Sequence, residues 1–497
     1  MKRLSYIITT IALVAALGSC KKHLELDPIS VIGSSSFLKT EGDVEPAVNA
    51  MYFRMRPLGN YNLFIWGEGR SEVMEPTGLA GTAGNDIYYQ NSLTRDNITN
   101  NLTWEIVYQT INAANLVIKY TPDIVFANAA NKNNALAQAY TMRAFMYFLL
   151  ARTYGAVPLR TEPTEAYDPI AIQVAKSPEA DVFKLVKADL DKALELFPVN
   201  TLPTGRNKWT KAGTNALKAD VYLWTGKRLN GGTADFTTAL NALTDVQTAA
   251  VSLLPSYADI FKYANKGNNE IIMAIRFTTS EPSTGNVQTY AHNMYASNTT
   301  FPAYVPQSQR DIVGAPLAGN GNVWRMTALV RDQFTNDDTR KAATYIDLAG
   351  PGADQYYTNY GLKFNGTVEA GARVFASDYI LYRLGDVLLM KAEAKNALNQ
   401  DPTPEMTLIR QRAYGANYAS HIFVNGSQAQ NDAAILKERL LELALEGKRW
   451  WDLIRFGKAF ETVPSLQGKS AQTYLLYFPI GTAVRTREPL VEEVPGW

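Results

Sequence analysis

Hydrophobic and polar residues follow each other along much of the chain with the 3.6-residue period of an amphipathic helix. Apolar side chains recur at this spacing from Leu102 to Tyr120, and again from Asn134 to Tyr154, where Gly155 ends the run. The pattern predicts three further helices in the first half of the chain, at Ser177–Phe197, Lys211–Trp224 and Phe236–Leu253. The first of these begins with a serine N-cap followed by proline, which is a typical helix start.

Small and large residues alternate within these helices, as in Ala139-Tyr140 and Ala219-Asp220. Helices of this length, joined by short breaks, are typical of tetratricopeptide-like helix pairs. The second half begins with a different stretch, residues 255–378, which is rich in Gly, Asn, Ser, Thr and Pro. The pattern there predicts a strand at Glu270–Phe277 and ordered loops elsewhere.

Helical patterns return at Leu384–Leu398 and at Asp432–Phe460, and Tyr474–Ile480 is an apolar, strand-like run. The predicted fold is therefore mainly α. Tetratricopeptide-like helix pairs form one large body, with a loop-rich segment and a few short strands in the second half.

The N-terminus has the pattern of an export signal that ends at a cysteine. Lys2 and Arg3 precede an uncharged run, Leu4–Gly18, which is too short to span a bilayer. Leu17-Gly18-Ser19-Cys20 matches a bacterial lipobox, so we expect residues 1–19 to be removed, Cys20 to be lipidated and residues 20–45 to form a tether. An ordinary export signal with a chance cysteine is the alternative.

Composition narrows the function classes. The 497 residues include 48 Lys and Arg and 47 Asp and Glu, so no basic excess points to nucleic acid. Three His and one Cys exclude a disulfide within the chain and leave little material for a zinc site. We find no dinucleotide, P-loop, zinc-protease or nucleophile-elbow motif, and we expect no cofactor, no metal and no catalytic residue. Because paired carboxylates meet only in space, a lipid-anchored glycoside hydrolase remains an alternative.

The densest motif is Lys437–Gly457, in which Glu438, Glu442 and Glu446 recur at four-residue spacing. A partly buried ion network that ties this helix to a neighbour is predicted for Glu442, Glu446, Arg449 and Arg455. We expect the partners to lie close in sequence. A ligand site built from the Arg, Glu and Trp residues of this motif is the alternative.

This motif resembles the signature of the SusD/RagB lipoproteins of Bacteroidetes. Further segments along the chain resemble the same family, namely Trp104–Asn115, Arg143–Leu159, Tyr382–Ala394 and Ile409–Ala413. The lipobox and the final Pro-Gly-Trp also agree, so the resemblance covers nearly the whole chain. It implies an N-terminal helical region at 46–254 and a C-terminal region at 255–497 that contains the loop-rich insert.

The resemblance also implies a function. Proteins of this kind are outer-membrane lipoproteins that face outward and capture a nutrient, usually an oligosaccharide, without being enzymes. They deliver it to a partner, a SusC-like TonB-dependent β-barrel transporter. Some members take peptides, so a peptide-binding lid of a related importer is a further alternative.

Two loop regions, Tyr61–Asn91 and Tyr290–Trp324, combine flat aromatic rings with hydrogen-bonding side chains, as a sugar site requires. The candidate ligand-binding residues are Trp66, Arg70, Asn85, Asp86, Tyr88, Tyr89, Tyr295, Tyr304, Arg310 and Trp324. The alternative is that these aromatic residues cover the helical core. If the two regions bind sugar, replacing Trp66 and Tyr88 by alanine should weaken glycan retention without unfolding the chain.

Overall fold

The computed structural model describes residues 38–79, 86–98, 103–165, 168, 170–283, 301–313 and 324–497. The predicted signal peptide, the lipidation site at Cys20 and most of the tether lie outside these residues. No helix among the described residues is long and apolar enough to cross a membrane.

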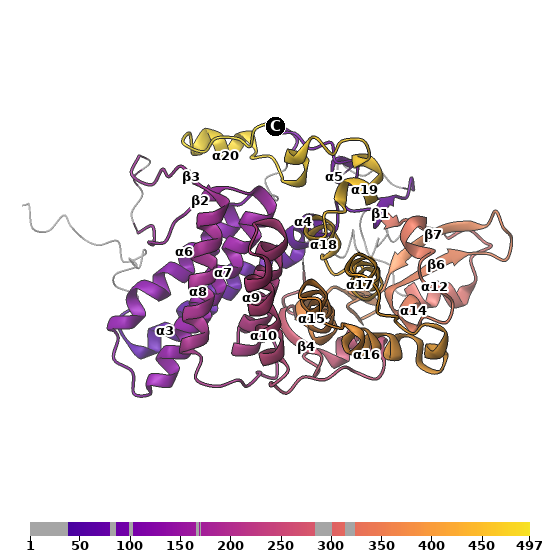
Figure 1. The fold of residues 1–497 in the computed structure, drawn as a ribbon, viewed down its shortest axis with the longest axis horizontal. Coiled ribbons are helices and arrows are strands. Elements are labelled where there is room, and N and C mark those ends of the chain that lie inside the picture. The colour runs from indigo at the N-terminus through magenta and orange to yellow at the C-terminus, as the bar shows by residue number, and fades with distance from the viewer. Residues whose placement is uncertain are drawn as a thin grey trace, which may run out of the picture.

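The first half is a row of long helices that pack against their sequence neighbours (Figure 1). They are α3 (Glu41–Met55), α6 (Glu105–Tyr120), α7 (Ala129–Tyr154), α8 (Glu179–Leu196), α9 (Lys211–Arg228) and α10 (Gly232–Val246). Their pairwise packing confirms the predicted helix-pair architecture. Helix α3 begins inside the predicted tether, because the Thr40 side chain and Asp43 form a capping box there.

Buried polar contacts fix the helices of this half relative to one another. Arg143 of α7 donates from Nε to Asp189 Oδ2 of α8 at 2.8 Å and from Nη1 to Asn115 Oδ1 of α6 at 2.9 Å. All three side chains are buried. Helix α7 ends at Tyr154 and is followed by Gly155, whose φ of +73° is a conformation that favours glycine.

The helical row continues into the second half, where α10 packs against α15 and α15 against α17. The helices there are α15 (Leu384–Ala397), α16 (Thr403–Tyr414), α17 (Gln428–Leu443) and α18 (Arg449–Arg455). The shorter helices and 3-10 turns of the chain are η1 (Arg56–Asn60), α4 (Asn62–Gly67), α5 (Asp86–Tyr89), η3 (Thr121–Asp123), η4 (Tyr257–Ile260), η5 (Tyr263–Asn265), α12 (Gln307–Val313), α13 (Ala328–Arg331), α14 (Thr339–Thr344), η6 (Gly415–Ser420), α19 (Ala459–Thr462), η7 (Pro464–Leu466), η8 (Thr473–Leu476) and α20 (Thr482–Arg487).

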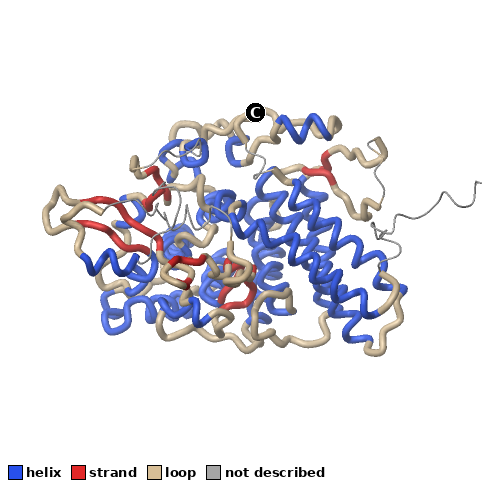
Figure 2. The backbone as a smooth tube through the Cα atoms, turned by 180° about the vertical axis from the view of Figure 1, so that it is seen from behind, coloured by secondary structure: helices blue, strands red, loops and turns tan. Residues whose placement is uncertain are grey.

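The strands of the described chain form two-stranded antiparallel pairs, and most lie away from the long helices of the first half (Figure 2). The pairs are β1 (Met74–Pro76) with β5 (Trp324–Met326), β2 (Val157–Pro158) with β3 (Lys176–Ser177), β4 (Ile271–Ile275) with β10 (Tyr379–Arg383), β6 (Tyr345–Ala349) with β7 (Tyr356–Gly361), and β8 (Thr367–Glu369) with β9 (Ala372–Val374). The strand predicted at Glu270–Phe277 is confirmed as β4. The loop-rich segment also holds the β6–β7 hairpin and short helices.

The single helix predicted over Asp432–Phe460 is wrong. Helix α17 ends at Leu443, and α18 begins at Arg449 after a turn in which Leu445 and Gly447 have φ of +68° and +71°. The buried carboxylate of Glu68 holds this turn, because it accepts the backbone N–H groups of Leu445 at 2.9 Å and Lys448 at 3.1 Å. A partner this distant in sequence cannot be found from helical periodicity.

Two other predicted boundaries also change. Helix α10 ends at Val246 rather than Leu253, because a turn follows and Ser252 then donates its backbone N–H to Asn269 O. Tyr474–Ile480 is not a strand. It starts with the turn η8 and continues as irregular chain in which Phe478 donates its N–H to Thr153 O at 2.8 Å. Its apolar side chains are buried together instead of alternating, which places them against the ends of the helices.

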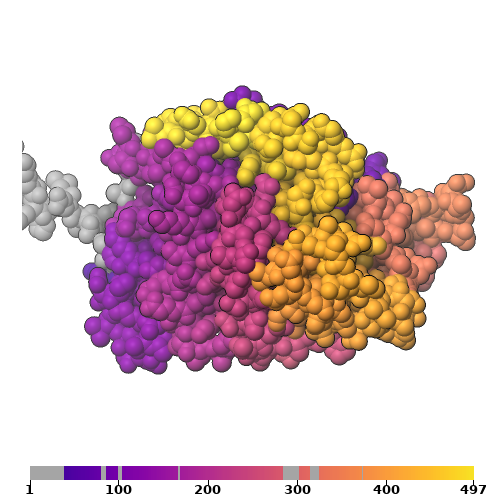
Figure 3. Space-filling model, viewed as in Figure 1, coloured from indigo at the N-terminus to yellow at the C-terminus, as the bar shows by residue number. Residues whose placement is uncertain are grey.

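One large core cluster contains residues of both halves, and the C-terminal segment lies across both (Figure 3). Several fully buried side chains are tryptophans, namely Trp66, Trp209, Trp224, Trp324 and Trp450. Three of the aromatic candidates selected from the sequence, Trp66, Tyr88 and Trp324, therefore lie in this core.

Candidate functional site

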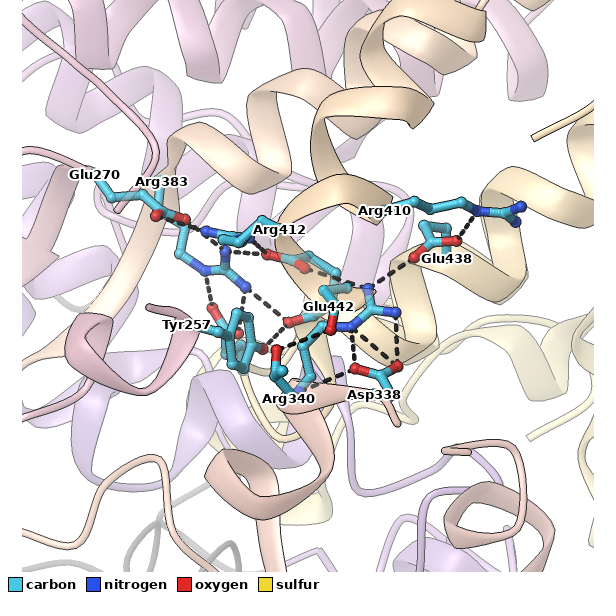
Figure 4. A network of polar contacts seen from close by, with 12 residues as sticks. Tyr257, Glu270, Asp338, Arg340, Arg383, Arg410, Arg412, Glu438 and Glu442 are labelled. Carbon is cyan, nitrogen blue, oxygen red and sulfur yellow. Dashed lines mark hydrogen bonds and ion pairs between the residues drawn. The ribbon is translucent and has the colours of Figure 1, made fainter. Parts of the chain in front are cut away.

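The glutamates of the densest sequence motif lie at the centre of a buried ion network (Figure 4). Glu438 accepts Arg340 Nη1 of α14 at 2.7 Å. Glu442 accepts Arg383 Nη1, at the end of β10, at 2.6 Å, and it also contacts Arg412 of α16. Three helices and one strand thus meet through charged side chains that are almost fully buried.

The arginines determine the protonation of these glutamates. Burial opposes ionisation of Glu442, but the charges of Arg412, Arg383 and Arg340 outweigh it and hold the pKa of Glu442 well below its usual value of 4.5. Glu446 accepts Arg383 Nη2 and Lys363 Nζ, each at 2.8 Å, and its pKa is lowered against burial for the same reason.

A second cluster ties α18 to the rest of the chain. Arg455 pairs with Glu393 of α15 at 2.9 Å, and Asp452 of α18 pairs with Arg439 of α17 at 2.8 Å. Arg449 pairs with Glu72 at 2.6 Å. The expected partners close in sequence are therefore mostly wrong, because the ion pairs join distant segments. The structural interpretation fits this motif better than a ligand site, since its charged atoms are buried and engaged by one another.

The two loop regions selected from the sequence meet in space. Strand β1 lies in the first region and pairs with β5 at the end of the second, with Met74 opposite Met326 and Pro76 opposite Trp324. The Tyr88 and Tyr89 rings both pack edge-on against Trp324, at centroid distances of 6.4 and 6.2 Å. This pairing brings 74–79 and 86–89 beside 324–326.

Four candidate residues are nevertheless core residues. Trp66, Arg70, Tyr88 and Trp324 are each 0% exposed, so no ligand reaches them in this structure. Arg70 donates to Asn91 Oδ1 at 2.8 Å and to two backbone carbonyls, those of Tyr477 and Leu475, and it lies between two aromatic rings. For these four residues the alternative interpretation, that they cover the helical core, describes the structure.

The expectation for the alanine variants changes with this placement. Trp66 and Tyr88 are packed in the core. Replacing a buried Trp by Ala removes about 3–5 kcal/mol of stability. A loss of glycan retention in that double variant would therefore not report on ligand contact alone, because we expect the variant to be destabilised.

The other candidates have different surroundings. Arg310 is half-buried and donates to the carbonyls of Val305 at 2.9 Å and Pro302 at 3.0 Å, so it shapes its own loop. Tyr304 packs against a small cluster beside β6 and β7. Asp86 and Tyr89 are half-buried on α5, and Gln90 Nε2 donates to the Tyr89 hydroxyl at 3.1 Å. Asn85 and Tyr295 lie outside the described residues.

Sequence reasoning missed several polar and aromatic residues next to β5. Arg325 Nε pairs with Glu75 Oε1 at 2.8 Å and lies over the ring of Tyr356, 5.6 Å from its centroid. Arg331 lies over the same ring at 4.8 Å and pairs with Asp347 at 2.7 Å. These charged residues are partly exposed. The sequence signal for this site was the aromatic and polar composition of the two loop regions. The second region ends at Trp324, so it did not include Arg325, Arg331 or Tyr356.

We call the partly exposed set on strands β1, β5 and β7 and on the short helices α5 and α13 the loop face. It consists of Glu75, Tyr89, Arg325, Arg331 and Tyr356. Burial raises the pKa of Tyr89 and of Tyr356, so both hydroxyls stay protonated at neutral pH and can donate and accept hydrogen bonds. Two rings beside guanidinium and carboxylate groups match the apolar faces and hydroxyls of a sugar. Within the described residues no group of His, Cys, Asp and Glu could hold a metal ion.

This arrangement defines a class of protein in which a scaffold of helix pairs carries a face built from loops and short strands. The chain belongs to the SusD family. The SusD family model matches residues 295–497, and a model described as starch-binding associating with outer membrane matches residues 26–223. Together they cover most of the described structure, including both halves of the loop face.

Individual relatives agree over nearly the whole chain. A SusD-like protein of Formosa agariphila is 27% identical, and the match covers 94% of this chain and 95% of the relative. Among solved structures, NanU of B. fragilis is 30% identical with a TM-score of 0.82, covering 95% of this chain and 100% of the other. A laminarin-binding SusD-like protein has the same fold, with 21% identity, a TM-score of 0.75, and coverage of 92% and 100%.

Proposed function

We propose that this protein captures a glycan on the loop face at the cell surface and delivers it to a SusC-like TonB-dependent transporter in the outer membrane. The observation that carries the proposal is the β1–β5 pairing, which joins two sequence regions of sugar-binding composition. Membership of the SusD family supports it, since the second family model is described as starch-binding. In this proposal Cys20 carries the lipid that holds the protein at the outer membrane, facing the exterior.

The binding test replaces the two partly exposed rings. Tyr89→Ala with Tyr356→Ala should lower affinity for a retained polysaccharide at least tenfold, about 1.4 kcal/mol. Affinity electrophoresis against a panel of neutral and acidic polysaccharides measures this. Phe53→Ala is the matched control, because Phe53 is an aromatic residue 65% exposed on α3, away from the loop face. Unchanged retention in the double variant would contradict the proposed site.

The anchor and the partner are tested separately. A Cys20→Ala protein should lose its acyl chains and fractionate as soluble, whereas continued membrane association would contradict the lipid anchor. Purification of the wild-type chain from its own membranes should bring a large β-barrel protein with it. Failure of that co-purification under mild detergent would contradict the transporter partnership but not glycan capture.

The hydrolase alternative has a specific weakness on the loop face. Glu75 of the loop face and Asp347, the partner of Arg331, are each paired with an arginine. Glycoside hydrolysis needs two carboxyl groups that flank one bond, whereas each carboxylate here is held by its own arginine. A reducing-sugar assay on the purified protein should show no release of sugar from any retained polysaccharide.

A further inference from the structure

A cavity of about 1020 Å³ lies in the first half of the chain, away from the loop face. Helix α6 forms its floor, α3 one wall, and the chain around Arg160–Thr164 and Ile172–Gln173 another. Helix α20, near the C-terminus, forms the remaining wall; it lies beyond the β2–β3 end of the helical row (Figure 1). We call this cavity the helical cleft. Its lining and the loop face share no residue.

The floor combines an apolar strip with side-chain amides. Gln109, Asn112, Ala113 and Leu116 follow one another at helical spacing, so they lie on one side of α6 and line the cleft together. The half-buried ring of Tyr108 adjoins them, and its hydroxyl donates to Pro158 O at 2.7 Å. That hydrogen bond fixes the orientation of the ring.

The rim has balanced charge. Three arginines and three glutamates line the cleft, namely Arg54, Arg160, Arg487, Glu105, Glu162 and Glu488. Two ion pairs connect the α20 segment to the floor and to a neighbouring wall. Arg487 Nη1 lies 3.3 Å from Glu105 of α6, and Glu488, which directly follows α20, lies 2.8 Å from Arg160 Nη2. The first pair is well exposed to solvent, so it is weak and can exchange for contacts to a ligand.

The side-chain amides of the floor can still form hydrogen bonds to a ligand. Asn112, which lines the cleft, accepts the backbone N–H of Thr164 through Oδ1 at 2.7 Å, and its NH₂ group has no acceptor among the described residues. Gln109 is exposed and donates Nε2 weakly to Glu105 at 3.4 Å. An amide, a carboxylate and a guanidinium placed around an apolar strip suit hydroxyl groups, which both donate and accept hydrogen bonds.

We propose that the helical cleft is a second ligand site, which binds a segment of a neutral oligosaccharide independently of the loop face. Its volume lies at the upper end of the range for ligand sites, so several sugar units fit. The balanced rim gives no preference for an anionic ligand. An extended peptide is disfavoured, because the helical walls use their backbone groups internally and offer no strand edge for main-chain pairing.

The test places a large side chain on the α3 wall, where it should fill part of the cleft. Ala50 is an exposed alanine of α3 that lines the cleft, and its neighbour Asn49 is exposed but does not line it. Ala50→Trp therefore fills the cleft without disturbing the core, and Asn49→Trp is the matched control. Gln109→Ala removes one amide and adds no bulk, which covers the case in which tryptophan perturbs α3.

The probes are neutral hexasaccharides of the malto, laminari, cello, xylo and manno series, titrated calorimetrically. Each is measured with the wild-type chain, with the cleft variants and with the loop-face variant that carries Tyr89→Ala and Tyr356→Ala. We expect at least one hexasaccharide to bind the loop-face variant still. Ala50→Trp should weaken that remaining binding at least tenfold and Gln109→Ala about threefold, whereas Asn49→Trp leaves it unchanged.

The outcomes separate this inference from the proposed function, on which it rests only for the class of ligand. Binding that disappears with the loop-face variant and is unaffected by Ala50→Trp overturns the second site and leaves the proposed function standing. Binding that Ala50→Trp alone removes supports the cleft and contradicts the loop face. Absence of binding by every hexasaccharide overturns the inference, as does selective retention of a random hexapeptide mixture by the cleft.

Discussion

The ion network around α17 and the loop face are built from the same residue types, yet they differ in their access to solvent. Both combine arginines, carboxylates and aromatic rings. In the network, Arg340, Arg383 and Glu442 are each 0% exposed and contact several partners. On the loop face, Arg325 and Glu75 form a single pair with side chains 26% and 38% exposed. Composition alone therefore does not distinguish a structural cluster from a binding surface.

The difference has an energetic consequence. A buried charge that loses its partner keeps its desolvation penalty, so each member of the network depends on the others. An exposed pair exchanges its partner for water at little cost. The loop face can therefore rearrange its charged side chains around a ligand, whereas the network holds four elements in fixed positions.

Breaking the network at Arg383 should have the largest effect. Arg383→Met leaves Glu442 and Glu446 without a main counter-charge in the core. We expect the free energy of unfolding to fall by about 3–5 kcal/mol, measured by urea denaturation. Arg325→Met on the loop face is the matched control. Equal small effects in the two variants would remove the energetic contrast between the regions.

Removing a buried aromatic residue that the sequence analysis selected should lower the free energy of unfolding by a similar amount. Trp66→Ala should lower the free energy of unfolding by about 3–5 kcal/mol, because it opens a cavity in the core. Tyr89→Ala, on the loop face, should cost less because the ring is only half-buried. Thermal unfolding of the two variants side by side checks this. A Trp66→Ala protein as stable as wild type would mean that Trp66 is not a core residue.

The free energy of unfolding should fall at acidic pH, because the glutamates of the ion network become protonated there. The folded pKa values of Glu442 and Glu446 lie below their usual value of 4.5, so the unfolded chain binds more protons on acidification. The stabilisation is complete above about pH 4.5 and is lost as the pH falls through the lower folded values. Urea unfolding between pH 6 and pH 3 measures the loss, and a flat profile would contradict it.

Glu68 should lower the free energy of unfolding as the pH rises, which is opposite to the effect of Glu442 and Glu446. Burial raises the pKa of Glu68 to about 7, against the three backbone N–H groups that it accepts. A raised folded pKa contributes stability below pH 4.5 that is lost as the pH rises through about 7. The wild-type chain should therefore lose some stability between pH 5 and pH 8, and Glu68→Gln should not. The same slope in both proteins would assign it to another group.

Breaking the exposed ion pair between Arg325 and Glu75 should change stability least. Arg325→Ala should change the free energy of unfolding by no more than about 1 kcal/mol, and less in high salt, because both side chains are partly solvated. Chemical denaturation at low and at high ionic strength measures this. A salt-independent loss of several kcal/mol would show that the loop face is as rigidly built as the network.

Local structure could be predicted from the sequence alone. Helical periodicity and capping residues placed α6, α8, α9 and α15 within a few residues of their ends, because these signals act over one or two turns. The densest motif identified the family, and the loop composition pointed to the two regions that β1 and β5 bring together. In each case the deciding interaction is short-range, or the pattern of residues is dense enough to be specific.

Only the tertiary structure decided which residues are buried and which meet. Glu68 breaks the helix predicted over Asp432–Phe460 from a position 377 residues before Leu445. Trp66 and Tyr88 are core residues, whereas Tyr356, which no sequence pattern singled out, lies on the loop face. Solvent access and ion pairing depend on how distant segments pack, and a linear pattern of polar and apolar residues does not contain that information.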